Sequence, residues 1–147
     1  MHKKVFIDAN VILDLFECSR LFHEYSTDVI GKLILDEEVE LFISTDMISN
    51  IFYILNNIYK YGFDKTLNVI EKISQIFNLH GVVQSDIRAS IDICKKHIFK
   101  DYEDALQYIC ALDDECTLIV TNNPKDFKNS SIDIATSKEL SEMWKHL

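Results

Sequence analysis

Hydrophobic positions follow two alternating patterns along the chain. Short continuous apolar runs, which are typical of buried strands, are separated by longer stretches in which apolar residues recur every three or four positions. The runs predict strands over 4–8, 40–44, 81–83, 117–120 and 132–135. The longer stretches predict helices over 10–17, 23–38, 45–61, 64–77, 86–97 and 102–113, and a last helix capped by Ser137.

This alternation predicts an α/β protein with a mainly parallel sheet, because a helix between two strands returns the chain to the same end of the sheet. The carboxyl ends of parallel strands share one edge, where open α/β sheets bind their ligands. Polar residues gather there after two predicted strands: Asp8 and Asn10 after the first, and 121–123 after the fourth. The sequence therefore puts its candidate chemistry at one edge of the sheet.

The composition fits one domain. The chain has 147 residues, of which 48% are hydrophobic, and it contains three glycines and one proline. So few glycines and prolines indicate no flexible linker, and we expect a single domain over 1–147. The apolar run before Asp8 is too short for a signal peptide or a membrane span, which predicts a cytoplasmic protein with no membrane partner. The four cysteines lack zinc-binding spacing and are expected to be reduced thiols.

The formal net charge of −9 limits the kinds of nucleic-acid-binding protein that the chain could be. It argues against a protein that coats nucleic acid through a broad basic surface. It does not exclude a nuclease, because carboxylates that hold metal ions add negative charge by themselves. Lysines near the acidic positions could guide RNA locally or form a solvated face: Lys95, Lys96, Lys100, Lys125 and Lys128.

Asp8 is the first candidate ligand. It directly follows a buried strand and precedes a helix, so its carboxylate could bind a divalent cation or could cap the helix N-terminus. Asn10 is open to a similar choice, since its amide could cap the helix or brace a carboxylate. The residues alone leave both interpretations open.

A second acidic group opens the helix predicted over 102–113. Asp101 is placed to cap this helix, and Glu103 and Asp104 lie in its first turn, where acids commonly complement the helix dipole. Asp104 lies away from the middle of the apolar face, so its carboxylate could point along the sheet edge toward a cleft or into water. Asp101 lies one turn earlier and could do the same.

A third polar group follows the fourth strand. Thr121, Asn122 and Asn123 end this strand, and Pro124 then begins a helical turn that brings Asp126 back toward the strand end. A purely structural polar loop is the alternative.

Together these three groups resemble the PIN-domain family, the fold of the VapC-type toxin ribonucleases. The motifs that carry the resemblance span residues 5–14, 101–107 and 119–127, and the resemblance covers essentially the whole chain. It implies a three-layer α/β/α sandwich around a mainly parallel sheet of order 3-2-1-4-5. It also implies an endoribonuclease that depends on Mg²⁺ or Mn²⁺.

On this resemblance, Asp8, Asp104 and Asp126 are the catalytic and metal-binding acids. Whether Asp126 or Asn123 is the nearer ligand in the last motif stays open. Thr121 and Asn122 would position a phosphate or a water molecule. The full set of supporting residues is Asn10, Asn50, Asp101, Glu103, Thr121, Asn122 and Asn123.

One position departs from the family pattern. PIN nucleases usually carry a glutamate on the helix after the second strand, and Asn50 stands at the matching position. Asn50 lies at the edge of an apolar helix face, so a structural hydrogen bond is the alternative to a site role. An amide can coordinate a cation but adds no charge, and Asp101 or Glu103 could restore that charge. The departure keeps a second function open, a catalytically degenerate PIN-like domain that binds RNA or protein.

Two other families with an Asp after the first strand fit less well. Haloacid-dehalogenase-like phosphatases need a second acid where this chain has Asn10. Response-regulator receivers need an acidic pair and a phospho-acceptor Asp that are not evident in the sequence.

The resemblance also bears on partners. It implies an RNA substrate, an antitoxin protein if the chain is a toxin, and a homodimer. Several aromatic residues could form a dimer surface or be buried in the core instead: Phe52, Tyr53, Tyr59, Tyr61 and Phe63.

Overall fold

Five parallel strands form the centre of the computed structural model, which describes residues 3–146. The strands are β1 (Lys4–Ile7), β2 (Glu40–Ser44), β3 (Asn78–His80), β4 (Leu118–Val120) and β5 (Asp133–Ala135). Their order is β3-β2-β1-β4-β5, and every neighbouring pair is parallel, so the predicted order 3-2-1-4-5 is confirmed. The ends of the predicted domain, positions 1, 2 and 147, lie outside the described residues.

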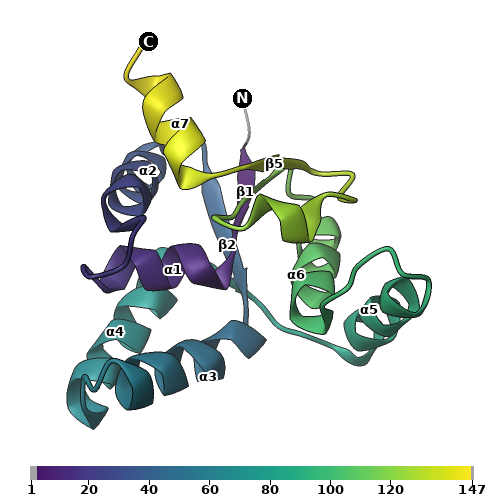
Figure 1. Ribbon diagram of the computed structural model, residues 1–147, viewed down its shortest axis with the longest axis horizontal. Coiled ribbons are helices and arrows are strands. Elements are labelled where there is room, and N and C mark those ends of the chain that lie inside the picture. The colour runs from purple at the N-terminus through teal and green to yellow at the C-terminus, as the bar shows by residue number, and fades with distance from the viewer. Residues whose placement is uncertain (1–2, 147) are drawn as a thin grey trace.

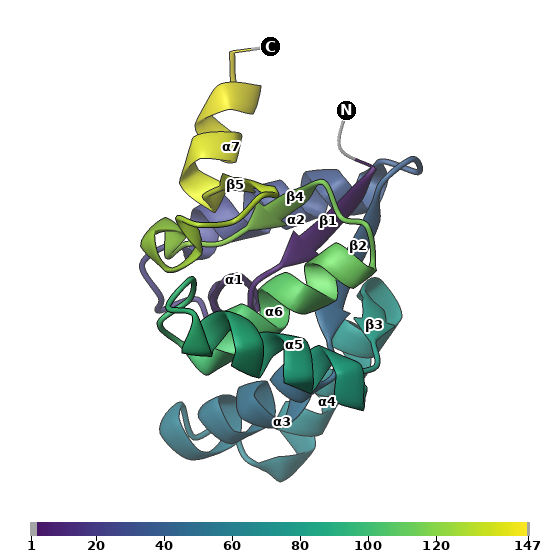
Figure 2. The same ribbon diagram turned by 90° about the vertical axis from the view of Figure 1, so that its right-hand side faces the viewer.

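Helices cover both faces of this sheet. Figure 1 shows α1 and α2 on one side of the strands and α5 and α6 on the other, and in Figure 2 α5 and α6 lie in front of the sheet. The predicted three-layer sandwich is therefore confirmed.

Among residues 3–146 no helix is long and apolar enough to cross a membrane. The helical elements are α1 (Ala9–Phe16), α2 (His23–Leu35), α3 (Asp46–Tyr53), the π-helix η1 (Ile54–Ile58), α4 (Phe63–Ile76), α5 (Gln84–Lys95), α6 (Tyr102–Asp113), the 3-10 helix η2 (Pro124–Phe127) and α7 (Ser137–Trp144).

The two central strands, β1 and β4, carry the core. Val5, Phe6 and Ile7 in β1 and all three residues of β4 are buried, as expected for parallel strands with helices on both faces. Ile7 is paired with Val120, so both strands end at the same level of the sheet. The residues that follow them are thereby brought side by side at the edge that the sequence predicts for the site.

The third strand lies three residues earlier than predicted. The sequence favours 81–83 because of its two valines, but β3 is Asn78–His80, which pairs with Phe42–Ser44 of β2. Val83 instead precedes α5 as its N-cap residue, and its backbone N–H donates to the Asp86 carboxylate at 3.0 Å. An edge strand is covered less than a central one, so β3 forms here from residues that are not fully buried.

Several helix boundaries also differ from the sequence prediction, and α2, for example, ends at Leu35 instead of residue 38. The helix predicted over 45–61 is α-helical only to Tyr53 and continues as the π-helix η1 to Ile58. Gly62 follows this segment and begins α4 with a φ of 87°, which glycine adopts without a steric penalty. Thr136 rather than Ser137 caps α7, since its hydroxyl accepts from the Glu139 N–H at 3.0 Å.

His80 connects the end of β3 to α5 and to the end of α6. Its Nε2 is hydrogen-bonded to Asp86 at 2.9 Å and its Nδ1 to Asp114 at 2.8 Å. Burial disfavours the charged ring, but the two carboxylates outweigh burial and raise the pKa of His80. Asp113 shares a hydrogen bond with Asp86, and this bond and burial raise the pKa of Asp113 to about 6.

We expect His80→Gln to lower the free energy of unfolding by about 2–3 kcal/mol at pH 6, because two hydrogen bonds to charged groups are lost. The loss should shrink at pH 9. A group whose pKa is raised in the folded state contributes its full stabilisation at pH values below its unfolded pKa, which is about 6.5 for histidine. This stabilisation disappears as the pH rises through the raised pKa of the folded state.

Urea denaturation at the two pH values measures this effect. His97→Asn is the control, since His97 is exposed and its positive φ of 60° is one that asparagine tolerates. An equal loss of stability for His80→Gln at both pH values would contradict a charged His80 ring.

Candidate active site

Asp8 lies at the carboxyl end of β1 and is only 4% exposed. Its backbone N–H continues the sheet by donating to the Val120 carbonyl at 3.0 Å. Its Oδ2 accepts a hydrogen bond from the Thr121 hydroxyl at 2.7 Å. Asp8 holds the N-cap position of α1, yet its side chain makes no capping hydrogen bond. Its carboxylate is therefore held by the end of β4 and by the backbone of Ala9, without a capping hydrogen bond.

Asp104 reaches the same region from the first turn of α6. Asp101 caps this helix, as the capping interpretation predicts, because its Oδ1 accepts from the Asp104 N–H at 3.0 Å. Asp104 itself is half-buried and lines a cavity together with Asp126 from η2. The cap thus fixes the helix start that directs Asp104 toward the strand ends.

The three acids form one electrostatic cluster. Burial raises the pKa of Asp8, hydrogen bonds such as that from Thr121 oppose this, and the charge of Asp126 adds to the rise. Burial also raises the pKa of Asp104 to about 7, and the charges of Asp101, Asp8 and Asp126 contribute further. Glu103, which is exposed on the same helical turn, adds a smaller effect of the same sign.

Gln107 is a site residue that the sequence analysis missed. It lies on α6 three residues after Asp104, so both side chains project from one side of the helix. Gln107 is only 5% exposed, and its amide is within hydrogen-bonding reach of Asp8. Its Oε1 is buried with no hydrogen-bond partner among the described residues. A glutamine between Leu106 and Tyr108, inside the apolar stripe of a helix, was the available signal, since a buried amide needs a partner.

These donors suit a hard divalent cation. Carboxylate oxygens and the unpartnered amide oxygen of Gln107 are the ligand type that Mg²⁺ and Mn²⁺ prefer. Within residues 3–146, no Lys, Arg or His side chain forms a salt bridge with Asp8, Asp104 or Asp126. A buried carboxylate without a counter-charge is unfavourable, and a bound cation would relieve this. The residues present therefore fit a metal site.

Asn122 and Asn10 connect the site to its support. The Asn122 Nδ2 donates to Asp14 at 2.5 Å, and its Oδ1 accepts from the Ser137 hydroxyl at 2.7 Å and N–H at 3.1 Å. Its backbone N–H donates to the Asn10 Oδ1 at 3.2 Å. The Asn122 amide is thus occupied by protein groups, and it joins the loop after β4 to α1 and α7.

Asn123 and Asp126 lie in the same loop but line different cavities. Asp126 lines a cavity of about 510 Å³ with Asp104, whereas Asn123 lines one of about 330 Å³ with Asn10 and Arg20. The charge of Asp126 raises the pKa of both Asp8 and Asp104, so Asp126 belongs to the acidic cluster.

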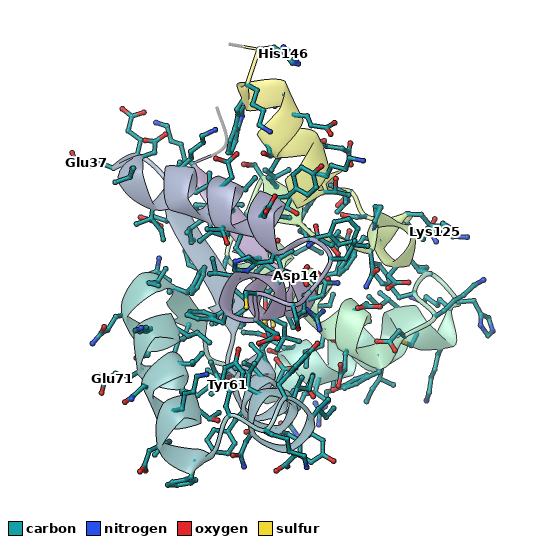
Figure 3. All side chains as sticks on the ribbon, turned by 60° about the vertical axis from the view of Figure 1, so that its left-hand side comes forward. Asp14, Glu37, Tyr61, Glu71, Lys125 and His146 are labelled. Atoms are coloured by element: carbon teal, nitrogen blue, oxygen red, sulfur yellow. The ribbon has the colours of Figure 1, made fainter. Side chains whose placement is uncertain are left out.

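Arg20 is held in place beside this second cavity. Its Nε donates to Asp14 at 2.5 Å, and another guanidinium nitrogen donates to the Tyr59 hydroxyl at 3.0 Å. In Figure 3 Asp14 lies near the centre of the view, on α1, while Lys125 lies at one side on η2. The buried Asp14 carboxylate is therefore paired by Arg20 and Asn122, in contrast to that of Asp8.

Asn50 is half-buried on α3. No hydrogen bond of its side chain is found in the part of the chain that the structure describes, and it lines neither of these two cavities. The structure thus gives no structural partner for this amide.

The chain is similar to known proteins along almost its full length. Residues 4–125 match the model of the PIN domain, a match that ends one residue before Asp126. The chain is 34% identical over 146 residues to Ribonuclease VapC1 of Aquifex aeolicus (strain VF5), covering 99% of this chain and 98% of that protein.

Two solved structures share the fold at low sequence identity. Mycobacterium tuberculosis VapC20, a Sarcin-Ricin loop cleaving toxin, has a TM-score of 0.63 and 12% identity, covering 78% of this chain and 86% of that one. A toxin–antitoxin complex from Klebsiella pneumoniae contains a chain with a TM-score of 0.68 and 17% identity, covering 90% of this chain and 97% of that one.

We expect Asn122→Ala to lower the free energy of unfolding by about 2–4 kcal/mol, because it removes several hydrogen bonds and leaves the buried Asp14 with one partner fewer. Chemical denaturation followed by circular dichroism measures the change. Asn68→Ala, on the exposed side of α4, is the matched control and should shift stability by less than about 0.5 kcal/mol. Equal small effects of both substitutions would show that Asn122 does not support the loop.

Proposed function

The chain belongs to the PIN-domain family, as a relative of the VapC ribonucleases, and from this premise we propose that it hydrolyses RNA with a Mg²⁺ or Mn²⁺ ion held by Asp8, Asp104 and Asp126. The observation that carries the proposal is the uncompensated cluster of three acids. Asp8 is buried, and the pKa of Asp104 is raised to about 7 by burial and by the neighbouring carboxylates. A divalent cation supplies the missing positive charge.

Each residue of the cluster then has a distinct task. Asp8 is the central ligand, and the Thr121 hydroxyl holds its Oδ2 so that the rest of the carboxylate faces the cluster. Asp104 and Asp126 complete the ligand set from α6 and η2. Gln107 supports Asp8 through its amide and has one free oxygen to offer.

A bound Mg²⁺ or Mn²⁺ ion supplies the chemistry that phosphodiester hydrolysis requires, by lowering the pKa of a water molecule and stabilising charge on the phosphate oxygens. The residues around it keep the site dry on one side. Val120, Leu106 and Ala105 are buried next to the acids, so the charges act in a medium of lower permittivity than water.

A second candidate function is supported by Asn50. If the site lacks one carboxylate where related nucleases have a glutamate, the domain could bind RNA or a protein partner without hydrolysis. The negative charges of Asp101 and Glu103 act on Asp104 and add to the charge of the acidic cluster, and we therefore favour hydrolysis.

We further propose that the protein acts as the toxin of a toxin–antitoxin pair and forms a homodimer. The support for the pair is the relationship to VapC1 and the fold shared with a toxin–antitoxin complex. Among the aromatic residues considered for a dimer surface, Tyr53 and Phe63 are mostly exposed. The hydroxyls of Tyr59 and Tyr61 instead make hydrogen bonds within the protein.

We expect Asp8→Asn to abolish Mn²⁺ binding measured by calorimetry and to reduce RNA hydrolysis by at least about 100-fold, because the central carboxylate is lost. The variant should be at least as stable as the unsubstituted protein in EDTA, since a buried charge is removed. Asp92→Asn, which changes an exposed carboxylate on α5, is the control and should keep both properties. Mn²⁺ binding of unchanged affinity in Asp8→Asn would refute the proposed site.

Asn50→Glu distinguishes the two candidate functions. If Asn50 occupies the glutamate position of the family, the added carboxylate should tighten Mn²⁺ binding about 10-fold, which corresponds to about 1.4 kcal/mol. Asn68→Glu on α4 adds the same charge elsewhere and should leave the affinity unchanged. Hydrolysis by Asn50→Glu but not by the unsubstituted protein would favour the degenerate domain, and unchanged Mn²⁺ affinity would place Asn50 outside the site.

A further inference from the structure

Three lysines and three aspartates line the larger of the two cavities. It has a volume of about 510 Å³ and lies between the α5–α6 loop and η2. The aspartates are Asp101, Asp104 and Asp126, and the lysines are Lys100, Lys125 and Lys128. The lysines come from two segments that are distant in sequence, so the fold and not a local run of charge brings them together.

None of these three lysines has a salt-bridge partner within residues 3–146, although carboxylates line the same cavity. The protein carries a net charge of −9, so the unpaired lysines gathered around one cavity are opposite in sign to the net charge of the protein. By contrast, Lys96 pairs with Asp92 at 2.9 Å on the exposed side of α5, and neither Lys95 nor Lys96 lines the cavity. The structure thus separates the five lysines near the acids into two groups.

The volume and the lining of the cavity limit the kind of ligand that it can bind. A volume of about 510 Å³ lies within the usual range of about 300–1,000 Å³ for small-ligand sites, and it is too small to enclose a duplex. Ile98 is 39% exposed on its wall and offers an apolar surface against which a base can pack. Cationic groups bind the phosphates of an unpaired RNA strand, and an apolar side chain beside them can contact a base that is not held in a duplex.

We propose that this cavity binds the backbone of an unpaired RNA strand next to the bond to be cleaved, with Lys100, Lys125 and Lys128 as phosphate-positioning residues. The substrate class, single-stranded RNA or an unpaired loop, rests on the proposed function. The acids and lysines have separate tasks, since the acids hold the cation and the lysines hold the phosphates that flank it. The lysines stay unpaired because their partner is the substrate.

Binding is measured in the Asp8→Asn background, where RNA is not cleaved. The probe is a fluorescein-labelled unpaired RNA of about 12 nucleotides, followed by anisotropy over a range of salt concentrations. Changing Lys100, Lys125 and Lys128 together to Gln should raise the Kd at least about 10-fold. It should also lower the slope of log Kd against log salt by about 2, because each contact with single-stranded RNA contributes about 0.7.

The matched control changes Lys72, Lys95 and Lys96 to Gln, which removes the same charge from exposed positions outside the cavity. It should change the Kd less than about 2-fold. Equal losses in the two triple variants would show a general effect of net charge and overturn the proposal, as would an unchanged Kd in the cavity variant. A labelled duplex of the same sequence that binds as tightly as the unpaired strand would overturn the choice of substrate class.

Mn²⁺ calorimetry on the cavity variant separates this proposal from the proposed hydrolysis. The proposal expects the variant to bind Mn²⁺ at least as tightly as the unsubstituted protein, because the acids are intact and nearby positive charge is removed. If the unsubstituted protein neither binds Mn²⁺ nor cleaves RNA, the proposed hydrolysis fails while the binding result still decides the role of the lysines. Loss of Mn²⁺ binding in the cavity variant would assign the lysines to the metal site and overturn their role as phosphate contacts.

Discussion

The burial of the Asp8 carboxylate at the end of the central strand is the constraint around which the site is organised. Burial without a counter-charge is unfavourable, and here a hydroxyl from the neighbouring strand and an amide from α6 only partly offset it. The fold tolerates this because β1 and β4 are buried among apolar side chains on both faces. Stability is thus provided by the strands, and the unfavourable charge lies where they end.

Three residues of the segment after β4 have three separate tasks. Thr121 holds the Asp8 carboxylate, and Asn122 fastens the loop to α1 and α7 through Asp14 and Ser137. Asp126 then brings a further negative charge to the acids. Because Asn122 makes the structural contacts of the loop, the acids themselves form no salt bridge within residues 3–146. This separation explains how buried and half-buried carboxylates remain uncompensated in a stable fold.

Much of the fold was predictable from short-range patterns. The continuous apolar runs of β1 and β4 and the acidic start of α6 are recognisable because burial on both faces and helix capping leave local signals. The strand β3 was misplaced because an edge strand can form from Asn78–His80 with little apolar content, while the adjacent Val83 serves as a helix cap residue. The π-helix η1 also left no recognisable signal, since its apolar spacing resembles that of an α-helix.

The sequence by itself determined the order of strands and helices and the family resemblance, and it predicted the three acids Asp8, Asp104 and Asp126. Only the tertiary structure decided that Gln107 meets Asp8, that the Asn122 amide is occupied by Asp14 and Ser137, and which lysines line the cavity. The physical reason is the range of the interactions. Burial and capping act between near neighbours and leave a pattern in the chain, whereas contacts between distant segments depend on how the layers pack, and no local spacing records them.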